Sequence, residues 1–267
     1  MDSGGRVGLI RGRMTRRALA LGGAGLAAGY VLHPGGRTAA MPEAIVEIWP
    51  QPVSDPASYD AYIPAACKSG DFYQYSCEFD AAWAVLKTYG IDSTFEELLG
   101  AIKIDRRIEP YYEETGEGVV IYGGDISTAY SGDYTGNFLA RTTGAAMRHV
   151  FKHFGMRVTH VHDRKRIEQN LQRGRLIWIK TTVDFKDWVP ATWITPGGKR
   201  IEVVLSNDHA AIVIGYDRRV VVIRDILGPT SSNWERPYEY EVEWETFLRC
   251  WAAQGSDGLA VGPPDAA

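Results

Sequence analysis

The sequence has no excess of basic residues. Its 29 Lys and Arg residues are outnumbered by 33 Asp and Glu residues, which gives a net charge of -4. The cations are scattered along the chain and form no basic stripe of the kind that follows a phosphate backbone. Nucleic acid is therefore not expected as a partner.

Internal repeats and low-complexity segments are also absent from the sequence. A chain of 267 residues exceeds one typical domain without requiring two, and a hydrophobic content of 45% is enough for a full core. The 8 Trp and 14 Tyr residues either fill that core or line a groove for an extended chain. Composition therefore favours one core with a tail.

A run long enough for a confident membrane-spanning helix is lacking as well. Residues 11–32 read RGRMTRRALALGGAGLAAGYVL, a basic cluster followed by a short, Gly-rich apolar region. This layout is typical of an export signal. The run from Thr15 to Leu19 resembles the twin-arginine motif that carries folded proteins across a bacterial membrane, and ordinary secretion is the alternative. Residues 38–40 offer small side chains for cleavage.

The sequence therefore divides into three parts. Residues 1–40 are expected to form an export signal, with retention as a membrane anchor through residues 16–32 as the alternative. Residues 41–66 are rich in proline and are expected to form an extended lead-in. The folded domain is expected over residues 67–267. The protein is predicted to be periplasmic, extracellular or anchored to the membrane.

Cysteine is scarce, and one of the three cysteines stands out. Cys77 lies in the run FYQYSCEFDAAWAVLKTYG (72–90), where apolar residues recur at helical spacing before a terminating glycine. The spacing predicts a helix that begins at Cys77, with Ser76 as its N-cap. A helix N-terminus favours a thiolate, although Glu78 and Asp80 add negative charge that opposes ionisation. Cys77 is therefore either a nucleophile or a small buried residue.

The other two cysteines suggest a disulfide. In an oxidising compartment, Cys67 and Cys250 can pair and leave Cys77 as a free thiol. A bridge that used Cys77 would remove it as a nucleophile. The pairing of Cys67 with Cys250 is a hypothesis that the structure can test.

The first half of the domain is predicted to be helical. A Ser-x-x-Glu capping box over Ser93–Glu96 starts a second helix. Apolar residues at helical spacing predict a third helix over residues 147–154, and a short helix follows over 163–173. Residues 105–137, between the second and third of these helices, are rich in Glu, Gly, Asp and aromatic residues. They are expected to form loops that serve binding.

The second half is predicted to be rich in β-strands. Short runs of Val and Ile, bounded by turn residues, indicate strands over residues 176–182, 201–205, 210–216 and 220–225. The last two are close enough to form a hairpin. A final helix carries Trp244, Phe247, Leu248 and Trp251 on one face. The expected architecture is an N-terminal helical lobe packed on a C-terminal antiparallel sheet, in one α+β domain.

A thiol nucleophile needs an imidazole to accept its proton and a third group to orient that imidazole. His209 opens the predicted strand 210–216, and Asp225 ends the neighbouring hairpin strand, so the two side chains can meet. Each residue also has an ordinary interpretation, His209 as a strand-end histidine and Asp225 as a turn residue. Their joint placement favours a catalytic pair.

These motifs, in this order, resemble the papain-fold cysteine peptidases related to the bacteriocin-processing, double-glycine-leader peptidases, and more narrowly their secreted bacterial branch. The nucleophile of that branch lies in a Ser-Cys-Glu helix, as in Ser76–Glu78 here, and a Tyr-Gly and a Thr-x-Glu-Glu-Leu-Leu stretch follow, as in residues 89–99. The catalytic histidine opens a strand similar to HAAIVIGYD (209–217), and the third residue lies in a turn similar to residues 224–228. The resemblance covers residues 70–255.

The resemblance implies a papain-like fold and hydrolysis of a peptide or amide bond through a thioester, with Cys77, His209 and Asp225 as the catalytic residues and no cofactor. The predicted oxyanion and substrate-binding residues are Gln74, Glu78, Gly124 and Asp125. Two positions depart from the family pattern. Asp71 stands where the family places its oxyanion glutamine, and Ile226 replaces a common proline.

Two other functions remain open. A cell-wall peptide amidase would use the same three residues, and a non-catalytic peptide-binding module would keep the fold without turnover. The pairs His149 with His153 and His160 with His162 have spacings that zinc ligands use, but no HExxH motif accompanies them. They are interpreted as solvated faces, and no metal site is predicted. A monomer that binds a peptide or protein substrate is expected.

Overall fold

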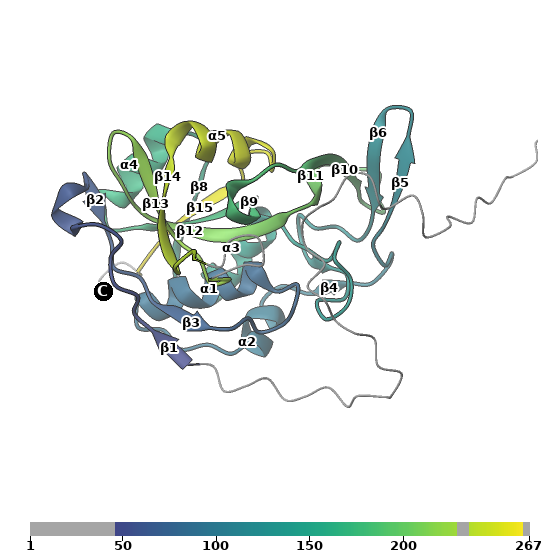
Figure 1. The fold of residues 1–267 in the computed structure, drawn as a ribbon. Helices are drawn as coiled ribbons and strands as arrows, with labels where there is room; N and C mark the ends of the chain where they lie inside the picture. The colour runs from purple at the N-terminus through teal and green to yellow at the C-terminus, as the bar shows by residue number, and fades with distance from the viewer. Residues whose placement is uncertain (1–45, 229–234, 264–267) are drawn as a thin grey trace, which may run out of the picture.

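The computed structural model describes residues 46–228 and 235–263. At its centre lies an antiparallel sheet with the strand order β14-β13-β12-β9-β15-β8, and β2 pairs with β12 at its side (Figure 1). The strands of this sheet are β2 (Ala61–Tyr62), β8 (Arg157–Val161), β9 (Leu176–Thr182), β12 (Asp208–Tyr216), β13 (Val220–Arg224), β14 (Glu239–Glu243) and β15 (Gly258–Gly262).

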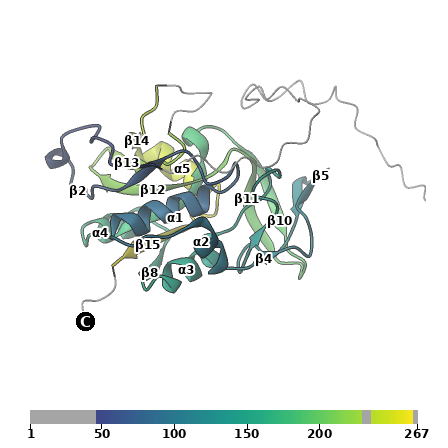
Figure 2. The same ribbon diagram turned by 90° about the horizontal axis from the view of Figure 1, so that it is seen from below.

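Helices cover both faces of the central sheet (Figures 1 and 2). One face packs against α1 (Cys77–Thr88) and α3 (Gly144–His153), with α2 (Phe95–Gly100) alongside α1. The other face packs against α4 (Arg164–Leu171) and α5 (Trp244–Ala252). Because side chains alternate along a strand, β9 contributes Trp178 to the first core and Ile179 to the second. This explains why residues 176–179, the first half of β9, read as a continuous hydrophobic run.

A second sheet of four strands stands to one side of the first, as Figure 1 shows. Its order is β11-β10-β6-β5, with β10 and β6 parallel. The strands are β5 (Tyr111–Thr115), β6 (Gly118–Tyr122), β10 (Val189–Ile194) and β11 (Arg200–Ser206). The prediction of loops throughout residues 105–137 is therefore wrong, and the strand predicted over 201–205 belongs to this sheet. Trp193 and Ile121 form part of its separate core.

The second helix begins one residue later than predicted. Its capping box joins Thr94 to Glu97, not Ser93 to Glu96. The Thr94 hydroxyl accepts a hydrogen bond of 3.2 Å from the Glu97 N–H, and the Glu97 carboxylate accepts one of 2.8 Å from the Thr94 N–H. Two orphan donors at the helix start are satisfied in this way.

The described part of the predicted lead-in, residues 46–66, contributes short strands to the fold. Strand β1 (Val46–Ile48) pairs with β3 (Cys67–Ser69), and β2 extends the central sheet. Two further short strands, β4 (Ile104–Asp105) and β7 (Tyr130–Ser131), pair with each other. The predicted export signal over residues 1–40 lies outside the described residues. Within residues 46–228 and 235–263, no helix has the length and apolar character that crossing a membrane requires.

Candidate active site

Cys77 is the first residue of α1, as the sequence predicts. Ser76 occupies the N-cap position, but its hydroxyl does not cap the helix. That hydroxyl accepts a hydrogen bond of 2.8 Å from the Tyr73 N–H and donates one of 2.6 Å to Asp80. The N–H of Cys77 itself has no acceptor in the described part of the chain, as is usual in a first helical turn. A hydrogen-bond donor therefore remains beside the thiol.

A buried ion pair anchors the loop that leads into Cys77. Lys68 Nζ lies 2.5 Å from Asp80 Oδ1, and both side chains are fully buried. The same Asp80 oxygen accepts a hydrogen bond of 2.9 Å from the Phe72 N–H, and Lys68 donates one of 2.5 Å to the Gly70 carbonyl. Burial raises the pKa of the Asp80 carboxyl, and the charge of Lys68 opposes that rise. The pair therefore ties the loop to β3 on one side and to α1 on the other.

A second buried network connects the cysteine helix to the histidine strand. Lys180 Nζ, on β9, lies 2.6 Å from Glu78 Oε1 and 2.9 Å from Asp208. Glu78 follows Cys77 in the chain, and Asp208 precedes His209. The ammonium group of Lys180 therefore binds the neighbour of each of these two predicted catalytic residues. Asp208 and Glu78 raise the pKa of Lys180 against the opposing effect of burial, so this group stays charged.

The predicted meeting of His209 and Asp225 is confirmed. β12 and β13 form the expected hairpin, and His209 Nε2 lies 2.9 Å from Asp225 Oδ1, with both side chains buried. The chain enters β12 through Asn207, whose left-handed φ of 68° is one that asparagine tolerates. Because Asp225 engages Nε2, Nδ1 is the ring nitrogen left for proton transfer.

Two residues that the sequence analysis missed hold Asp225 in place. Arg236 Nη1 and the Tyr240 hydroxyl each donate a hydrogen bond of 2.8 Å to Asp225 Oδ2. The Leu227 N–H donates one of 3.0 Å to Oδ1. Burial alone would raise the pKa of Asp225, but the charges of His209 and Arg236 hold it well below its usual range. No local pattern marks Arg236 or Tyr240, because both reach Asp225 from beyond the turn after β13.

The pKa shifts of Cys77 and His209 do not favour a preformed ion pair between a thiolate and an imidazolium, because the thiol is held in its neutral form. Burial and the Glu78 carboxylate, whose Oε2 lies 3.5 Å from the sulfur, raise the pKa of the Cys77 thiol. The predicted preference for a thiolate is therefore outweighed in this structure. Burial lowers the pKa of His209, but Asp225 more than compensates, so the net shift is upward. Within residues 46–228 and 235–263, no hydrogen bond joins Cys77 to His209.

Two of the predicted oxyanion and substrate-binding residues lie next to the cysteine. Gln74 is exposed, and its side-chain amide donates a hydrogen bond of 3.1 Å to the Tyr75 hydroxyl. Glu78 is only 1% exposed and is bound to Lys180. The prediction that Glu78 binds substrate is therefore corrected, because its carboxylate holds the fold together and is closed to solvent.

Gly124 and Asp125 have structural contacts. The Gly124 N–H donates a hydrogen bond of 2.8 Å to Ser131 Oγ, and its carbonyl accepts one from the Trp193 indole. Any side chain at Gly124 would collide with Asp105, which accepts a hydrogen bond of 2.7 Å from the Asp125 N–H. This turn therefore joins β6 to the short strand pair. A role of Gly124 and Asp125 in substrate binding stays a prediction.

The predicted disulfide between Cys67 and Cys250 is wrong, because all three cysteines are free. Cys67 lies in the core beneath α1, whereas Cys250 lies in the core beneath α5. The central sheet therefore separates the two sulfurs. Burial raises the pKa of the Cys67 thiol to about 12 and also raises that of Cys250. Cys77 is the one cysteine with partial exposure.

The four histidines with metal-like spacing lie on exposed positions. His149 and His153 are on α3, and His160 and His162 lie at the end of β8 and just beyond it. In the part of the chain that the structure describes, no group of three or more His, Cys, Asp or Glu side chains is arranged to hold a metal ion.

The α+β architecture is that of a papain-like cysteine peptidase fold, which confirms the predicted fold class. The chain belongs to the Peptidase_C39-like family, whose model matches residues 57–259. Among solved structures, the crystal structure of a candidate C39-like peptidase from Bacillus anthracis matches with a TM-score of 0.53. The two chains are 18% identical, and the match covers 72% of this chain and 90% of that one. No match was found among curated proteins.

Proposed function

We propose that this protein hydrolyses peptide or amide bonds, with Cys77 as nucleophile, His209 as general base and Asp225 as the group that orients His209. The observation that carries the proposal is the buried bond of 2.9 Å between His209 and Asp225, which leaves one imidazole nitrogen for proton transfer. The Lys180 network supports it, because it ties α1 and β12 together at the residues adjoining Cys77 and His209. Membership of a cysteine peptidase family supports the reaction class.

The protonation of the site favours proton transfer during attack. The Cys77 thiol passes its proton to His209 Nδ1 as the sulfur bonds to the carbonyl carbon of the substrate. The imidazolium, stabilised by Asp225, then protonates the departing amine as the C–N bond breaks. A water molecule, deprotonated by His209, attacks the thioester and releases the carboxylic acid product. The proton returns to the sulfur in that step.

The oxyanion of the tetrahedral intermediate needs hydrogen-bond donors. The Cys77 N–H is one candidate, since it has no acceptor in the described residues. Asp71 is a second. Although this residue is exposed, loss of hydration around its carboxyl and the nearby Asp80 charge raise its pKa to about 7. With that pKa, about half of the Asp71 carboxyls are protonated at pH 7, and the protonated form donates a hydrogen bond, as the glutamine of the family pattern would.

The proposal extends to the substrate and the compartment. An exported protein of the bacteriocin-processing type would act on peptides or proteins outside the cytoplasm, whereas a cell-wall amidase would act on muropeptides. The export assignment is supported by residues 11–32 alone. Incubating the purified protein with muropeptides and, separately, with unstructured peptides would distinguish the two substrates by their cleavage products.

The central test is the variant Cys77→Ala. Removal of the nucleophile is expected to lower kcat/KM by about 10³-fold or more while leaving thermal unfolding unchanged. In the native protein, iodoacetamide should label Cys77 before the buried Cys67 and Cys250, and labelling should abolish turnover. Hydrolysis by Cys77→Ala at the native rate would refute the proposal. Equal peptide binding by both proteins, without turnover by either, would favour a non-catalytic binding module.

A further inference from the structure

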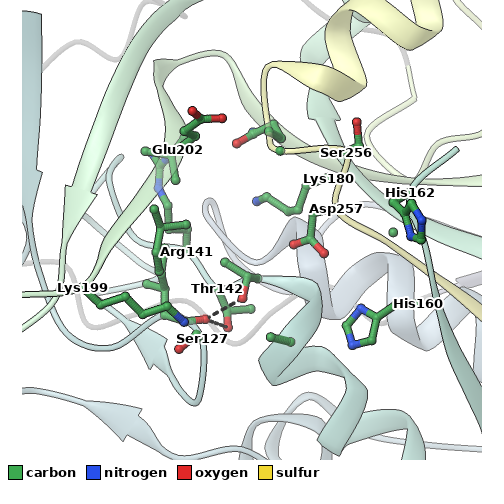
Figure 3. Close-up of a pocket in the computed structure, with 18 of the residues that line it drawn as sticks. Ser127, Arg141, Thr142, His160, His162, Lys180, Lys199, Glu202, Ser256 and Asp257 are labelled. Carbon is green, nitrogen blue, oxygen red and sulfur yellow. Dashed lines mark hydrogen bonds between the residues drawn. The ribbon is translucent and has the colours of Figure 1, made fainter.

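A cavity of about 500 Å³ opens beside the Lys180 network, and its lining includes none of the proposed catalytic residues (Figure 3). Its walls come from the first turn of α3, the ends of β8 and β9, and the starts of β11 and β15. A water molecule occupies about 30 Å³ of the liquid, so this volume admits a small ligand and not only isolated waters. The cavity is therefore a second concave site, separate from the proposed active site.

The cavity is lined by a buried guanidinium group that is incompletely bonded. Arg141 is 1% exposed; its Nε donates a hydrogen bond of 3.0 Å to the Leu139 carbonyl, and Nη1 donates one of 2.6 Å to the Val204 carbonyl. Its Nη2 has no hydrogen-bond partner among the described residues. The nearest carboxylate that pairs with it, Asp208, lies 3.8 Å from Nε. A buried, unpartnered donor on a charged group is costly, and an oxyanion is the acceptor that suits it best.

The charges around the cavity also favour an anion. Lys199 and Arg200 are exposed on the β11 side of the cavity. Figure 3 shows Lys199 and Arg141 on one wall and Lys180 on the other. Four Lys or Arg side chains line the cavity: Arg141, Lys180, Lys199 and Arg200. Because Glu78 and Asp208 already pair with Lys180, the attraction for an anion comes from the other three, against two acids, Glu202 and Asp257.

One of these two acids, Asp257, is already bonded within the fold. Asp257 accepts a hydrogen bond of 2.6 Å from the Gly144 N–H at the start of α3. Burial raises the pKa of its carboxyl, against the opposing effect of that hydrogen bond. Glu202 is exposed, so solvent screens it. The positive end of α3, a helix of ten residues, adds to the surplus of positive charge.

We infer that this cavity binds a small ligand through a carboxylate or phosphate group, which Arg141 Nη2 and the basic side chains at the mouth recognise. The site is distinct from the proposed active site, because neither Cys77 nor His209 lines it, although Lys180 belongs both to its lining and to the network beside those two residues. An anion seated there would accept a hydrogen bond from Arg141 and would be attracted by Lys199 and Arg200 through partly screened charge.

The test is a binding titration of the full chain carrying Cys77→Ala, so that turnover and active-site thiol chemistry play no part. Inorganic phosphate, acetate, a dipeptide with a free C-terminus and the same dipeptide amide are titrated separately by calorimetry at low ionic strength. At least one of the three anionic probes should bind saturably, and the amide should not. The ranking of phosphate, acetate and dipeptide identifies the source of the anionic group.

Three variants locate the binding. Arg141→Gln should weaken binding of the anion by about tenfold or more, since it removes a charge-assisted donor. If that buried change prevents folding, the exposed double variant Lys199→Gln with Arg200→Gln tests the location of the site instead. It should weaken binding of the anion by about threefold and reduce the salt dependence of binding. The control, Lys165→Gln with Arg173→Gln, makes the same charge change at exposed positions outside the cavity lining and should leave binding unchanged.

Two results would overturn the inference. The first is the absence of saturable binding by phosphate, acetate and the free dipeptide. The second is equal weakening by the mouth variant and by the control, which would show nonspecific attraction to a basic surface. Neither result bears on the Cys77 reaction, which is measured separately by turnover of the native protein.

Discussion

The cysteine side and the histidine side of the proposed active site are supported by different kinds of electrostatic contact. On the cysteine side, Lys68 and Lys180 form buried ion pairs with carboxylates on α1 that fix the backbone around Cys77. On the histidine side, Asp225 contacts the imidazole of His209 directly. The first arrangement fixes the backbone, and the second sets the protonation of the imidazole. Variants on the two sides should therefore fail in different ways.

The largest effect is expected on the histidine side. Asp225→Asn removes the negative charge that orients and stabilises the His209 imidazolium, and kcat/KM should fall by about 10²–10⁴-fold. Because Asp225 raises the pKa of His209, the residual acid limb of the pH profile should move to lower pH. Hydrolysis rates measured from pH 4 to 9 check both effects. An unshifted acid limb would contradict the assigned role of Asp225.

Asp225→Asn should also change how the free energy of unfolding depends on pH. Asp225 has a lowered pKa, so its contribution is present above its unfolded pKa of about 3.9 and is lost as pH falls. His209 has a raised pKa, so its contribution is complete below about pH 6.5 and is lost as pH rises. The free energy of unfolding of the native protein should therefore exceed that of Asp225→Asn most clearly between about pH 4 and 6.5.

The next effect is expected on the cysteine side. Lys68→Met leaves the Asp80 carboxylate buried without its partner and should cost about 3–5 kcal/mol of unfolding free energy, measured in urea at pH 7. The loss should be smaller at acidic pH, because Asp80 can then take up a proton. Adding Asp80→Asn to Lys68→Met, which removes the buried charge and keeps an acceptor for the Phe72 N–H, should recover part of the stability. The acid limb of the activity profile should not move.

A smaller effect is expected for Arg236, the residue behind Asp225. Arg236→Gln removes a hydrogen bond between charged groups, worth about 1.5–3 kcal/mol, so kcat should fall by about 10–100-fold. Because Arg236 lowers the pKa of His209, the acid limb should move to higher pH, opposite to the shift in Asp225→Asn. Arg236→Lys keeps the charge and should restore most of that shift. Equal shifts in Gln and Lys variants would mean that Arg236 acts by packing alone.

The smallest effect tests Asp71 as an oxyanion donor. In the native protein, ionisation of Asp71 near its pKa of about 7 should remove the donor as pH rises. Asp71→Gln keeps an amide donor at every pH. The ratio of its kcat/KM to that of the native protein should therefore be near one at pH 5 and rise to about tenfold by pH 9. A ratio that does not change with pH would exclude the donor role.

Much of the central fold is predictable from the sequence. The helix that begins at Cys77, the strand 176–182 and the hairpin that brings His209 to Asp225 all follow local periodicity and short connections. The sheet formed by β5, β6, β10 and β11 does not follow from local patterns of this kind. Its parallel pair joins Val119 to Ala191, so the partner that makes residue 119 a strand lies far along the chain. Glu113, Glu114 and Gly118 weaken the strand signal that Val119, Val120 and Ile121 give when that partner is left out.

The residues that hold the catalytic groups of the candidate site could not be predicted from local sequence patterns either. Lys180 reads as a polar interruption in a hydrophobic strand, and only the folded chain shows that it pairs with both Glu78 and Asp208. Arg236 likewise has no sequence signal near Asp225. The disulfide prediction failed because counting cysteines says nothing about which face of a sheet each one occupies.

The sequence by itself determined that Cys77 starts a helix and that His209 and Asp225 occupy facing ends of a hairpin, because helical spacing, strand alternation and turn length act over a few residues. Tertiary structure alone decided how α1 is held against β12, what the pKa of each catalytic group becomes, and where the anion cavity lies. Those properties depend on burial and on charges that meet across the fold, and neither is set by neighbours in the chain.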